Sequence, residues 1–555
     1  MNLLKTKEVR SNGDSNSVKK NKVMLLFPPG KVYVRPDGSP SARKHCSPPI
    51  GIAYLASNLL KHGYDVKVID ALVDGFDQEY YEEPFVVYGL NPQEIAKKVK
   101  EYNPDVVGVS VLFSMTVSEV FKMCEEIKKY LPHLPILLGG QHPSGVPMDC
   151  MKRPYIDYVI TGEAELTMLR FMDALNGKIK FEEVPNLYFK DKNSNIINTN
   201  KLNNVRPMIE GKGWEYYARK ESSVPEKLDD LPYPAWHLFN MEGYWNSNVR
   251  TGGGNPKTNR YAVMLSTRGC PHTCNFCTSP LASGYKAYRK RSNECVLKEI
   301  KWLVDTYQVG EIQFVEDNFF VSKKRAKSLM IDLAREFPDL YFQSTGGTEV
   351  NALDDEMIEL MAKSNFYHAI LAIESGDPEV QAKSVDKNVK LDRIPHVIEK
   401  LKKHNIEIKA LYMIGFPGET RAQVQRTVDL ALNLGVLDFN LSIVTPLPGT
   451  PLYDECIEKG LFLEGATVST LNYDKSNIKL GDLTADELEE IRRNVWQKAF
   501  AKKMEQQKKD AKNIKAKYNY TSVQDFQFNG FKIRPPSREK NKISKKPEVQ
   551  HLSTY

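Results

Sequence analysis

Apolar strand segments alternate with amphipathic helix segments twice along this chain, and the alternation leaves few folds open. In the first series we predict strands at residues 23–27, 66–69, 106–111, 136–138 and 158–160, and helices at 50–62, 118–130 and 165–175. Strands that are apolar on both faces and separated by helices are typical of a buried parallel sheet. We therefore predict a doubly wound α/β domain, whose ligands bind at the carboxyl ends of the strands.

The second series begins near residue 261. We predict strands at 261–266, 311–315, 341–344, 369–373, 408–414 and 439–444, and helices between them at 293–307, 323–337, 354–364, 391–404 and 421–434. A complete βα barrel has eight units. Six units therefore predict a partial (β/α)6 barrel with an open side.

A chain of 555 residues is too long for one core, because domains usually hold ~100–200 residues. We expect a disordered N-terminal tail (1–21), a Rossmann-like domain (22–179), a connector (180–257), a barrel (258–480), a C-terminal helical segment (481–510) and a basic, disordered tail (511–555). We expect a small hairpin near residues 186–198 of the connector, and we expect the aromatic stretch 231–237 to pack between the two domains.

Composition excludes several classes of protein. No stretch approaches the ~18–20 apolar residues that span a bilayer, and the polar first 22 residues are not a secretory signal. Residues 501–555 hold twelve Lys and two Arg against five acidic residues, so the net charge of +7 reflects this tail. We interpret the tail as a solvated helix face or loose arm, and the alternative is an arm that binds RNA or a protein partner. We expect a soluble, cytoplasmic protein without membrane insertion and without a nucleic-acid partner.

Three of the eight cysteines stand together in the sequence R-G-C-P-H-T-C-N-F-C. Cys270, Cys274 and Cys277 follow the first barrel strand, and barrel active sites lie at that end of the strands. Three thiolates on one loop can hold a four-iron cluster and leave one iron open for a non-protein ligand. The alternative is zinc with His272 as the fourth ligand, but His272 is crowded inside the loop and the chain has no second C-x2-C.

The C-x3-C-x2-C run, with Phe276 before its last cysteine, resembles the radical S-adenosylmethionine (SAM) superfamily over roughly residues 261–453. The resemblance implies that the three cysteines hold a [4Fe–4S] cluster and that SAM chelates the open iron. The reduced cluster would then cleave SAM to methionine and a 5′-deoxyadenosyl radical. Phe276 is included among the residues implied to bind SAM.

Further SAM-binding candidates lie in the segments F-V-E-D-N, I-E-S-G and M-I-G-F-P-G-E, which end three later strands and resemble superfamily motifs. They are Glu316 and Asp317 for the SAM amino group, Glu374 and Ser375 for the ribose hydroxyls, and Gly415 for close approach of the adenine. The simpler interpretation of each segment is a helix cap or a turn.

The first domain resembles the N-terminal domain of cobalamin-binding radical SAM enzymes. The resemblance is carried in order by P-P-I-G-I-A-Y-L-A, H-G-Y-D-V-K-V-I-D, P-D-V-V-G-V-S, L-G-G-Q-H and T-G-E-A-E. It implies that the strand ends bind cobalamin through small residues that let a flat macrocycle or its nucleotide tail approach. The candidates are Ser110, Ser114, Gly139, Gly140 and Gly162.

One motif of other cobalamin domains is missing: the chain has no D-x-H-x-x-G, whose histidine takes the lower cobalt position. Many cobalamin-type radical SAM proteins share that absence. We assign His142, which follows Gly139 and Gly140 at a strand end, to loop packing in preference to cobalt ligation. A domain that binds no cobalamin remains the alternative.

Together the resemblances imply a cobalamin-dependent radical SAM methyltransferase that acts on an unactivated carbon or phosphorus, similar in some stretches to the phosphonate C-methyltransferases. The alternative is a non-methylating radical reaction on the same architecture, such as oxidative cyclisation or rearrangement. An iron–sulfur electron carrier or a zinc-stabilised binding protein is disfavoured, because the fourth ligand is missing.

The expected partners are a small-molecule substrate and an electron donor such as flavodoxin or ferredoxin. Substrate selection is expected at the top of the barrel, from residues such as Gln343, Thr345 and Glu349.

Overall fold

The computed structural model describes residues 20–34, 38, 40, 44–199, 225–247, 256–283, 288–385, 389–468 and 470–518. The disorder predicted for residues 1–19 and 519–555 concerns parts of the chain outside the described residues. Within the described residues, no helix is long and apolar enough to cross a membrane.

A seven-stranded sheet with the order β10-β9-β8-β7-β6-β1-β3 forms the core of the first half. Its parallel strands are β1 (Lys22–Phe27), β3 (Asp65–Asp70), β6 (Val106–Ser110), β7 (Ile136–Gly139) and β8 (Tyr158–Ile160). Helices α1 (Ile50–Lys61) and α7 (Glu165–Leu175) pack on one face, and α3 (Pro92–Tyr102) and α4 (Val117–Tyr130) on the other. The predicted doubly wound fold is confirmed, and its switch point lies between β1 and β6.

Two features of this half differ from the prediction. The hairpin expected near residues 186–198 is present as β9 (Leu187–Lys190) and β10 (Ile196–Asn198), but it does not belong to the connector, because β9 pairs antiparallel with β8 and extends the sheet. A separate antiparallel sheet joins β2 (Gly30–Tyr33), β5 (Phe85–Tyr88) and β4 (Glu79–Glu82). Neither pairing is visible in local periodicity, because both depend on contacts between distant segments.

The second half is a six-stranded parallel sheet whose strands lie in chain order. They are β11 (Tyr261–Met264), β14 (Glu311–Phe314), β15 (Tyr341–Ser344), β16 (Phe366–Glu374), β17 (Glu407–Ile414) and β18 (Asp438–Ile443). The intervening helices are α10 (Asn293–Tyr307), α11 (Lys323–Glu336), α12 (Asp355–Lys363), α14 (Ile394–Lys403) and α15 (Arg421–Asn433). Among the described strands, β11 and β18 do not pair with each other, so the barrel is open, as predicted.

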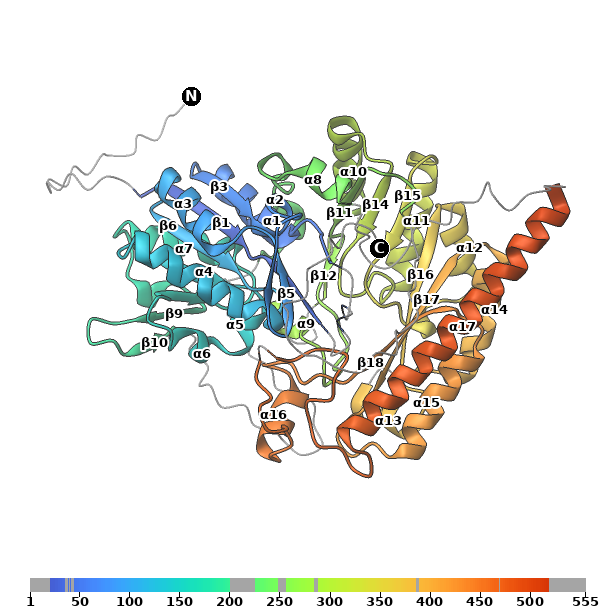
Figure 1. The fold of residues 1–555 in the computed structure, drawn as a ribbon. Helices are drawn as coiled ribbons and strands as arrows, with labels where there is room; N and C mark the ends of the chain where they lie inside the picture. Colours follow the sequence, from blue (N-terminus) through green and yellow to red (C-terminus); the bar gives the residue numbers. More distant parts are fainter. Residues whose placement is uncertain are drawn as a thin grey trace, which may run out of the picture.

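Residues 225–247, a part of the connector after the hairpin that the structure describes, pack between the two halves, as expected for the aromatic stretch 231–237 (Figure 1). Trp236 is fully buried among side chains of both halves. The ring of Tyr233 lies 5.5 Å from that of Trp302 on α10. On the other side, the backbone N–H of Ala235 donates to the Ala53 carbonyl of α1 at 3.0 Å. The two sheets therefore share one continuous apolar core.

The chain continues through α16 (Pro451–Glu458) and α17 (Ala485–Tyr518). Helix α17 packs on α15 and β18 and buries Leu488, Val495 and Ala499. It extends past residue 510, so residues 511–518, which we predicted to be disordered, are helical. The Lys- and Ala-rich sequence there contains no Gly or Pro and favours helix continuation.

Candidate active site

The carboxyl ends of the two sheets meet at the cysteine loop. Helix α5 (Gln141–Gly145), which follows β7, contacts α9 (Ser279–Ser283), which follows the cysteines (Figure 1). The Thr278 hydroxyl donates to Gln141 Oε1 at 2.7 Å. A Cβ on Gly145 would lie 2.5 Å from the Pro448 carbonyl oxygen, in the loop after β18. Ligands held at these two edges would therefore be neighbours.

The cysteine loop is closed by a two-stranded ribbon. Strands β12 (Thr267–Arg268) and β13 (Arg289–Lys290) pair antiparallel on either side of it. Gly269 turns the chain into the loop with a φ of 86°, which favours glycine. Cys274 is buried and Cys270 and Cys277 are half-buried.

Segments that follow three of the barrel strands anchor the cysteine loop. The Asn275 N–H donates to the Ser384 carbonyl at 3.4 Å, and the Leu452 N–H donates to the Asn275 carbonyl at 3.0 Å. Phe276 packs on Phe416, with the ring centroids 6.0 Å apart. These partners follow β16, β18 and β17 respectively, so the loop is held in place by the barrel itself.

The donor set of the loop fits a [4Fe–4S] cluster better than zinc. Three thiolates supply one ligand each for three irons, and thiolate ligands for different irons need not converge on one point. Among the described residues, no group of three or more His, Cys, Asp or Glu side chains could hold a single metal ion. His272, the fourth ligand of the zinc alternative, has its Nε2 3.0 Å from Glu349 Oε2.

Glu316 and Asp317 end β14 beside this loop, but their side chains have different partners. Glu316 is buried and accepts a hydrogen bond from the Ser266 hydroxyl, one strand away. Burial raises the pKa of Glu316, and nearby Arg325 and Ser266 oppose that shift. Asp317 Oδ1 accepts from the Ser279 hydroxyl at 2.5 Å. Both carboxylates therefore lie at the strand end where the sequence placed them.

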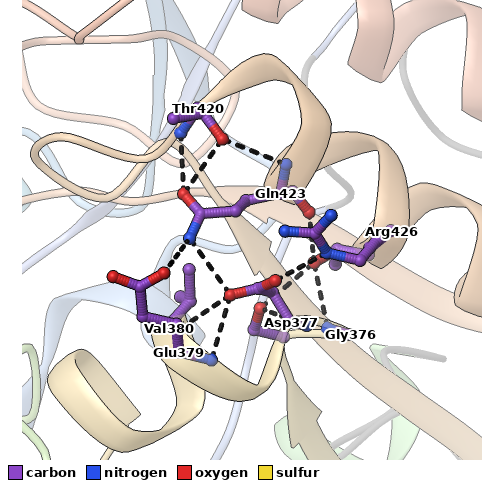
Figure 2. A network of polar contacts seen from close by, with 9 residues as sticks. Gly376, Asp377, Glu379, Val380, Thr420, Gln423 and Arg426 are labelled. Carbon is purple, nitrogen blue, oxygen red and sulfur yellow. Dashed lines mark hydrogen bonds and ion pairs between the residues drawn. The ribbon is translucent and has the colours of Figure 1, made fainter.

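The segment after β16 is fastened to helix α15 by the polar network of Figure 2. Glu374, buried and with a φ of 65°, ends the strand at a bulge. Gly376 donates its N–H to Thr427 Oγ1 at 2.9 Å. Asp377 caps the short helix that follows and accepts from Arg426 Nε at 2.6 Å and Gln423 Nε2 at 3.2 Å. The network fixes the backbone on which Glu374 and Ser375 stand.

Thr427→Val tests this network, because it removes the hydroxyl and keeps the shape of the side chain. The half-buried Gly376 N–H loses its acceptor, and the Ser375 hydroxyl loses a partner at 3.1 Å. We expect a loss of about 1–3 kcal/mol in unfolding free energy and weaker SAM binding in equilibrium dialysis. Thr427→Ser, which retains the hydroxyl, should bind SAM almost as the parent does; equal affinity in the valine variant would contradict this role.

Gly415 has a structural reason to be glycine that the sequence did not reveal. Its φ is 89°, and a Cβ there would lie 2.5 Å from Leu488 of α17. Its N–H and that of Phe416 donate to Glu419 Oε2, at 2.6 and 3.0 Å. Approach of adenine to Gly415 remains a prediction, whereas packing of α17 against it is observed.

Glu419 should make stability depend on pH. Burial raises its pKa to about 7, well above the value of 4.5 in an unfolded chain. The folded state thus binds the proton more tightly, and the stability gained from it is present below pH 4.5 and lost as the pH rises through 7. The side chain in Glu419→Gln stays neutral. Between pH 5.5 and pH 8, the unfolding free energy of the parent should therefore fall by about 2 kcal/mol more than that of the variant. Urea unfolding of both proteins at the two pH values measures this difference. Equal pH dependence in the parent and the variant would contradict the raised pKa of Glu419.

The cobalamin candidates lie along the carboxyl edge of the first sheet. Ser110 ends β6 opposite Gly139 of β7. Ser114 is buried, and its hydroxyl lies 3.0 Å from Nδ1 of His142. His142 itself is 2% exposed, and burial lowers its pKa to about 4. This environment fits the predicted packing role of His142.

The three glycines of this edge differ in what surrounds them. A Cβ on Gly139 would meet nothing closer than 3.8 Å, which leaves room for a ligand. Gly140 has a φ of 107°, and a Cβ there would lie 2.7 Å from the Val111 carbonyl. Gly162, with a φ of 79°, donates its N–H to Ser144 Oγ at 2.8 Å. Gly139 therefore fits a site for a flat ligand. At Gly140 and Gly162 glycine is favoured because the backbone turns with a positive φ.

Apolar surface is exposed next to the switch point. Leu112 and Phe113, directly after β6, are 37% and 46% exposed. Exposed apolar side chains at a ligand-binding edge suit the apolar face of a macrocycle. This edge therefore fits cobalamin.

Two residues were placed wrongly or missed from the sequence. Gln343, expected at the barrel top, is fully buried, and its Nε2 donates to Glu311 Oε1 and the Tyr367 hydroxyl at 2.8 and 2.7 Å, which leaves it no role in substrate selection. Tyr473 lies outside every motif. Its side chain is 41% exposed, and partial burial, with a smaller contribution from Cys277, raises its pKa. Its backbone is tied to β18, since the Ile443 N–H donates to its carbonyl at 2.9 Å.

Comparisons with known proteins agree with this geometry. The B12 binding domain family matches residues 41–171, and the Radical SAM superfamily matches residues 264–431. Cytidylyl-2-hydroxyethylphosphonate methyltransferase of Streptomyces wedmorensis is 30% identical over 482 residues, covering 83% of this chain and 86% of the relative. Anaerobic magnesium-protoporphyrin IX monomethyl ester cyclase of Rubrivivax gelatinosus is 24% identical over 74% of this chain and 67% of the relative.

The fold also matches a solved structure. The radical S-adenosylmethionine methyltransferase TsrM from Kitasatospora setae, with cobalamin and a [4Fe–4S] cluster bound, superposes with a TM-score of 0.59 at 18% identity. The match covers 79% of this chain and 75% of that chain.

Proposed function

The chain belongs to the cobalamin-dependent radical SAM enzymes, and we propose that it transfers a methyl group from SAM to an unactivated carbon or a phosphorus of a small-molecule substrate. The contact between the cysteine loop and the carboxyl ends of the first sheet carries this proposal. A methyl group carried by one cofactor must reach a substrate activated by the other, and the contact makes the two sites neighbours.

The cofactors of this family are a [4Fe–4S] cluster, SAM and cobalamin; the cluster supplies the electron that cleaves SAM, and cobalamin carries the methyl group. Cys270, Cys274 and Cys277 would hold the cluster. At the strand ends, Glu316, Asp317, Glu374 and Ser375 would orient SAM through its amino group and ribose hydroxyls, and Phe276 and Gly415 would line its site. Ser110, Ser114 and Gly139 would face cobalamin.

Glu374→Ala tests the SAM site apart from the cluster. The variant loses a buried carboxylate at the end of β16 that would accept hydrogen bonds from the ribose hydroxyls. We expect SAM affinity to fall about tenfold or more while about four iron atoms remain bound. A variant that binds SAM as the parent does would remove Glu374 from the site.

Isotope-labelled SAM tests the reaction itself. With methyl-deuterated SAM, methyl transfer predicts a trideuterated product together with S-adenosylhomocysteine and 5′-deoxyadenosine. The cyclase relative favours a second candidate, an oxidative cyclisation. That reaction would form 5′-deoxyadenosine without S-adenosylhomocysteine and would contradict methyl transfer. Cytidylyl-2-hydroxyethylphosphonate, named for the first relative, is the first substrate to try.

We further propose that the enzyme works in the cytoplasm and receives its electron from a flavodoxin or ferredoxin. A cluster with an open iron needs a reducing compartment and a donor of low potential. Reduction of the reconstituted cluster by each donor, followed by its absorbance, tests this pairing.

A further inference from the structure

Two arginines and two glutamates form a buried network between the two halves of the molecule. Arg268 of β12 and Arg289 of β13 are paired across the ribbon that closes the cysteine loop. Glu163 lies between β8 and α7, and Glu165 is the first residue of α7. The network therefore joins the base of the cluster loop to the carboxyl edge of the first sheet.

The Arg268 guanidinium is forked between the two glutamates. Its Nη1 donates to Glu163 Oε2 at 3.0 Å, and its Nη2 donates to Glu165 Oε1 at 2.7 Å. Arg289 Nη2 forms an ion pair with the other oxygen of Glu163. The side chains of Arg268, Glu163 and Glu165 are 11%, 7% and 5% exposed, so salt screens the network only weakly.

Further contacts fix the network against helix α1. The Arg268 guanidinium lies 5.0 Å from the centre of the Tyr54 ring. The Glu165 carbonyl accepts from Asn58 Nδ2 at 2.8 Å. Burial alone would raise the pKa of Glu165, but Arg268 outweighs burial and holds the pKa below its usual value. Glu165 and Arg268 are therefore held together as an ion pair in this site.

We propose that Arg268, Arg289, Glu163 and Glu165 are positioning residues that fix the separation between the iron–sulfur cluster and cobalamin. Arg268 stands two residues before Cys270, and Glu163 directly follows Gly162. Buried ion pairs contribute little to stability compared with apolar packing, but their geometry is strict. This inference rests on the two cofactors of the proposed function and is independent of the substrate.

Arg268→Gln in the full-length enzyme, reconstituted with both cofactors, tests the proposal. The readout is the dipolar interaction between the reduced cluster and cob(II)alamin in pulsed electron paramagnetic resonance. We expect a narrow distance distribution in the parent and a broader or shifted one in the variant, with iron and cobalt contents unchanged. Methylated product should fall about 100-fold, whereas 5′-deoxyadenosine should still form.

Control variants distinguish a positioning role of the network from a general loss of structure. Lys128→Gln breaks an ion pair with Asp157, at 2.8 Å, inside the first half alone, and should leave the distance distribution unchanged. The lysine in Arg268→Lys keeps the positive charge but can pair with only one glutamate. Its cluster–cobalamin distance distribution should therefore lie between those of the parent and of Arg268→Gln. If Arg268→Gln does not fold, Arg289→Gln, whose arginine is 20% exposed, provides the same measurement.

An unchanged distribution in Arg268→Gln and Arg289→Gln would overturn the proposal. A parent enzyme that makes no methylated product would instead contradict the proposed function. In that case the distance measurement still decides whether the network positions the two cofactors.

Discussion

Cys274→Ala is expected to abolish cluster assembly and, with it, all cleavage of SAM. Cys274 is the middle one of the three proposed cluster ligands and is buried, at 7% exposed. Two remaining thiolates cannot replace it, because the cluster requires a ligand for each iron that SAM does not occupy. Iron per chain should drop from about four to near zero after anaerobic reconstitution, and 5′-deoxyadenosine should become undetectable.

A second buried cysteine provides the control for this substitution. Cys124 lies on α4 in the first half and is fully buried, and burial raises the pKa of its thiol. Cys124→Ala removes the same atom and should keep the full iron content. A Cys274→Ala variant that retained four iron atoms and formed 5′-deoxyadenosine would contradict the cluster assignment.

Gly145→Ala is expected to reduce methyl transfer about 100-fold without removing either cofactor. The added Cβ would lie 2.5 Å from the Pro448 carbonyl oxygen and 3.2 Å from the Gly449 Cα. Both atoms are backbone, so no side chain can move aside and the two sheet edges must separate. Product formation and metal content, measured on the same sample, test the prediction.

Gly51→Ala is the matched control, since nothing lies within 4 Å of a Cβ there and the residue is in helix α1. It should leave product formation unchanged. A Gly145→Ala enzyme with the parent's rate of methyl transfer would show that the close approach of the two edges is unnecessary.

The sequence predicted the elements of both sheets well where the strands are buried on both faces. Strand β8 and helices α7 and α10 have the predicted bounds, because continuous apolar runs and amphipathic helices report burial locally. The hairpin β9–β10 and the strand β2 were misplaced or missed. Their positions depend on partners far along the chain, which local periodicity does not encode.

The candidate site was predictable to a similar degree. The cysteine spacing predicted a cluster loop, which stays a prediction, and Glu316 and Glu374 lie at the strand ends where we expected them. The role in substrate selection that we predicted for Gln343 was wrong. A polar residue near a strand end can equally face the interior of the barrel, and there Gln343 donates a hydrogen bond to Glu311. The glycine at position 415 predicted that another group approaches the backbone closely. In the structure that group is the Leu488 side chain.

The contacts between the two halves could not be predicted from the sequence. Nothing in T-G-E-A-E indicates that Glu163 and Glu165 face Arg268. Likewise, no pattern pairs Gln141 with Thr278. Such contacts follow from how the two folded halves dock, and docking is a property of surfaces assembled from distant segments.

The metal content of the reconstituted chain tests the central claim, that cluster and cobalamin occupy neighbouring sites in one enzyme. The purified protein is treated anaerobically with iron, sulfide and hydroxocobalamin, desalted, and analysed for iron and cobalt. We expect about four iron atoms and one cobalt per chain. Four iron atoms without cobalt would keep the radical SAM barrel but contradict the cobalamin-dependent methyl transfer proposed here.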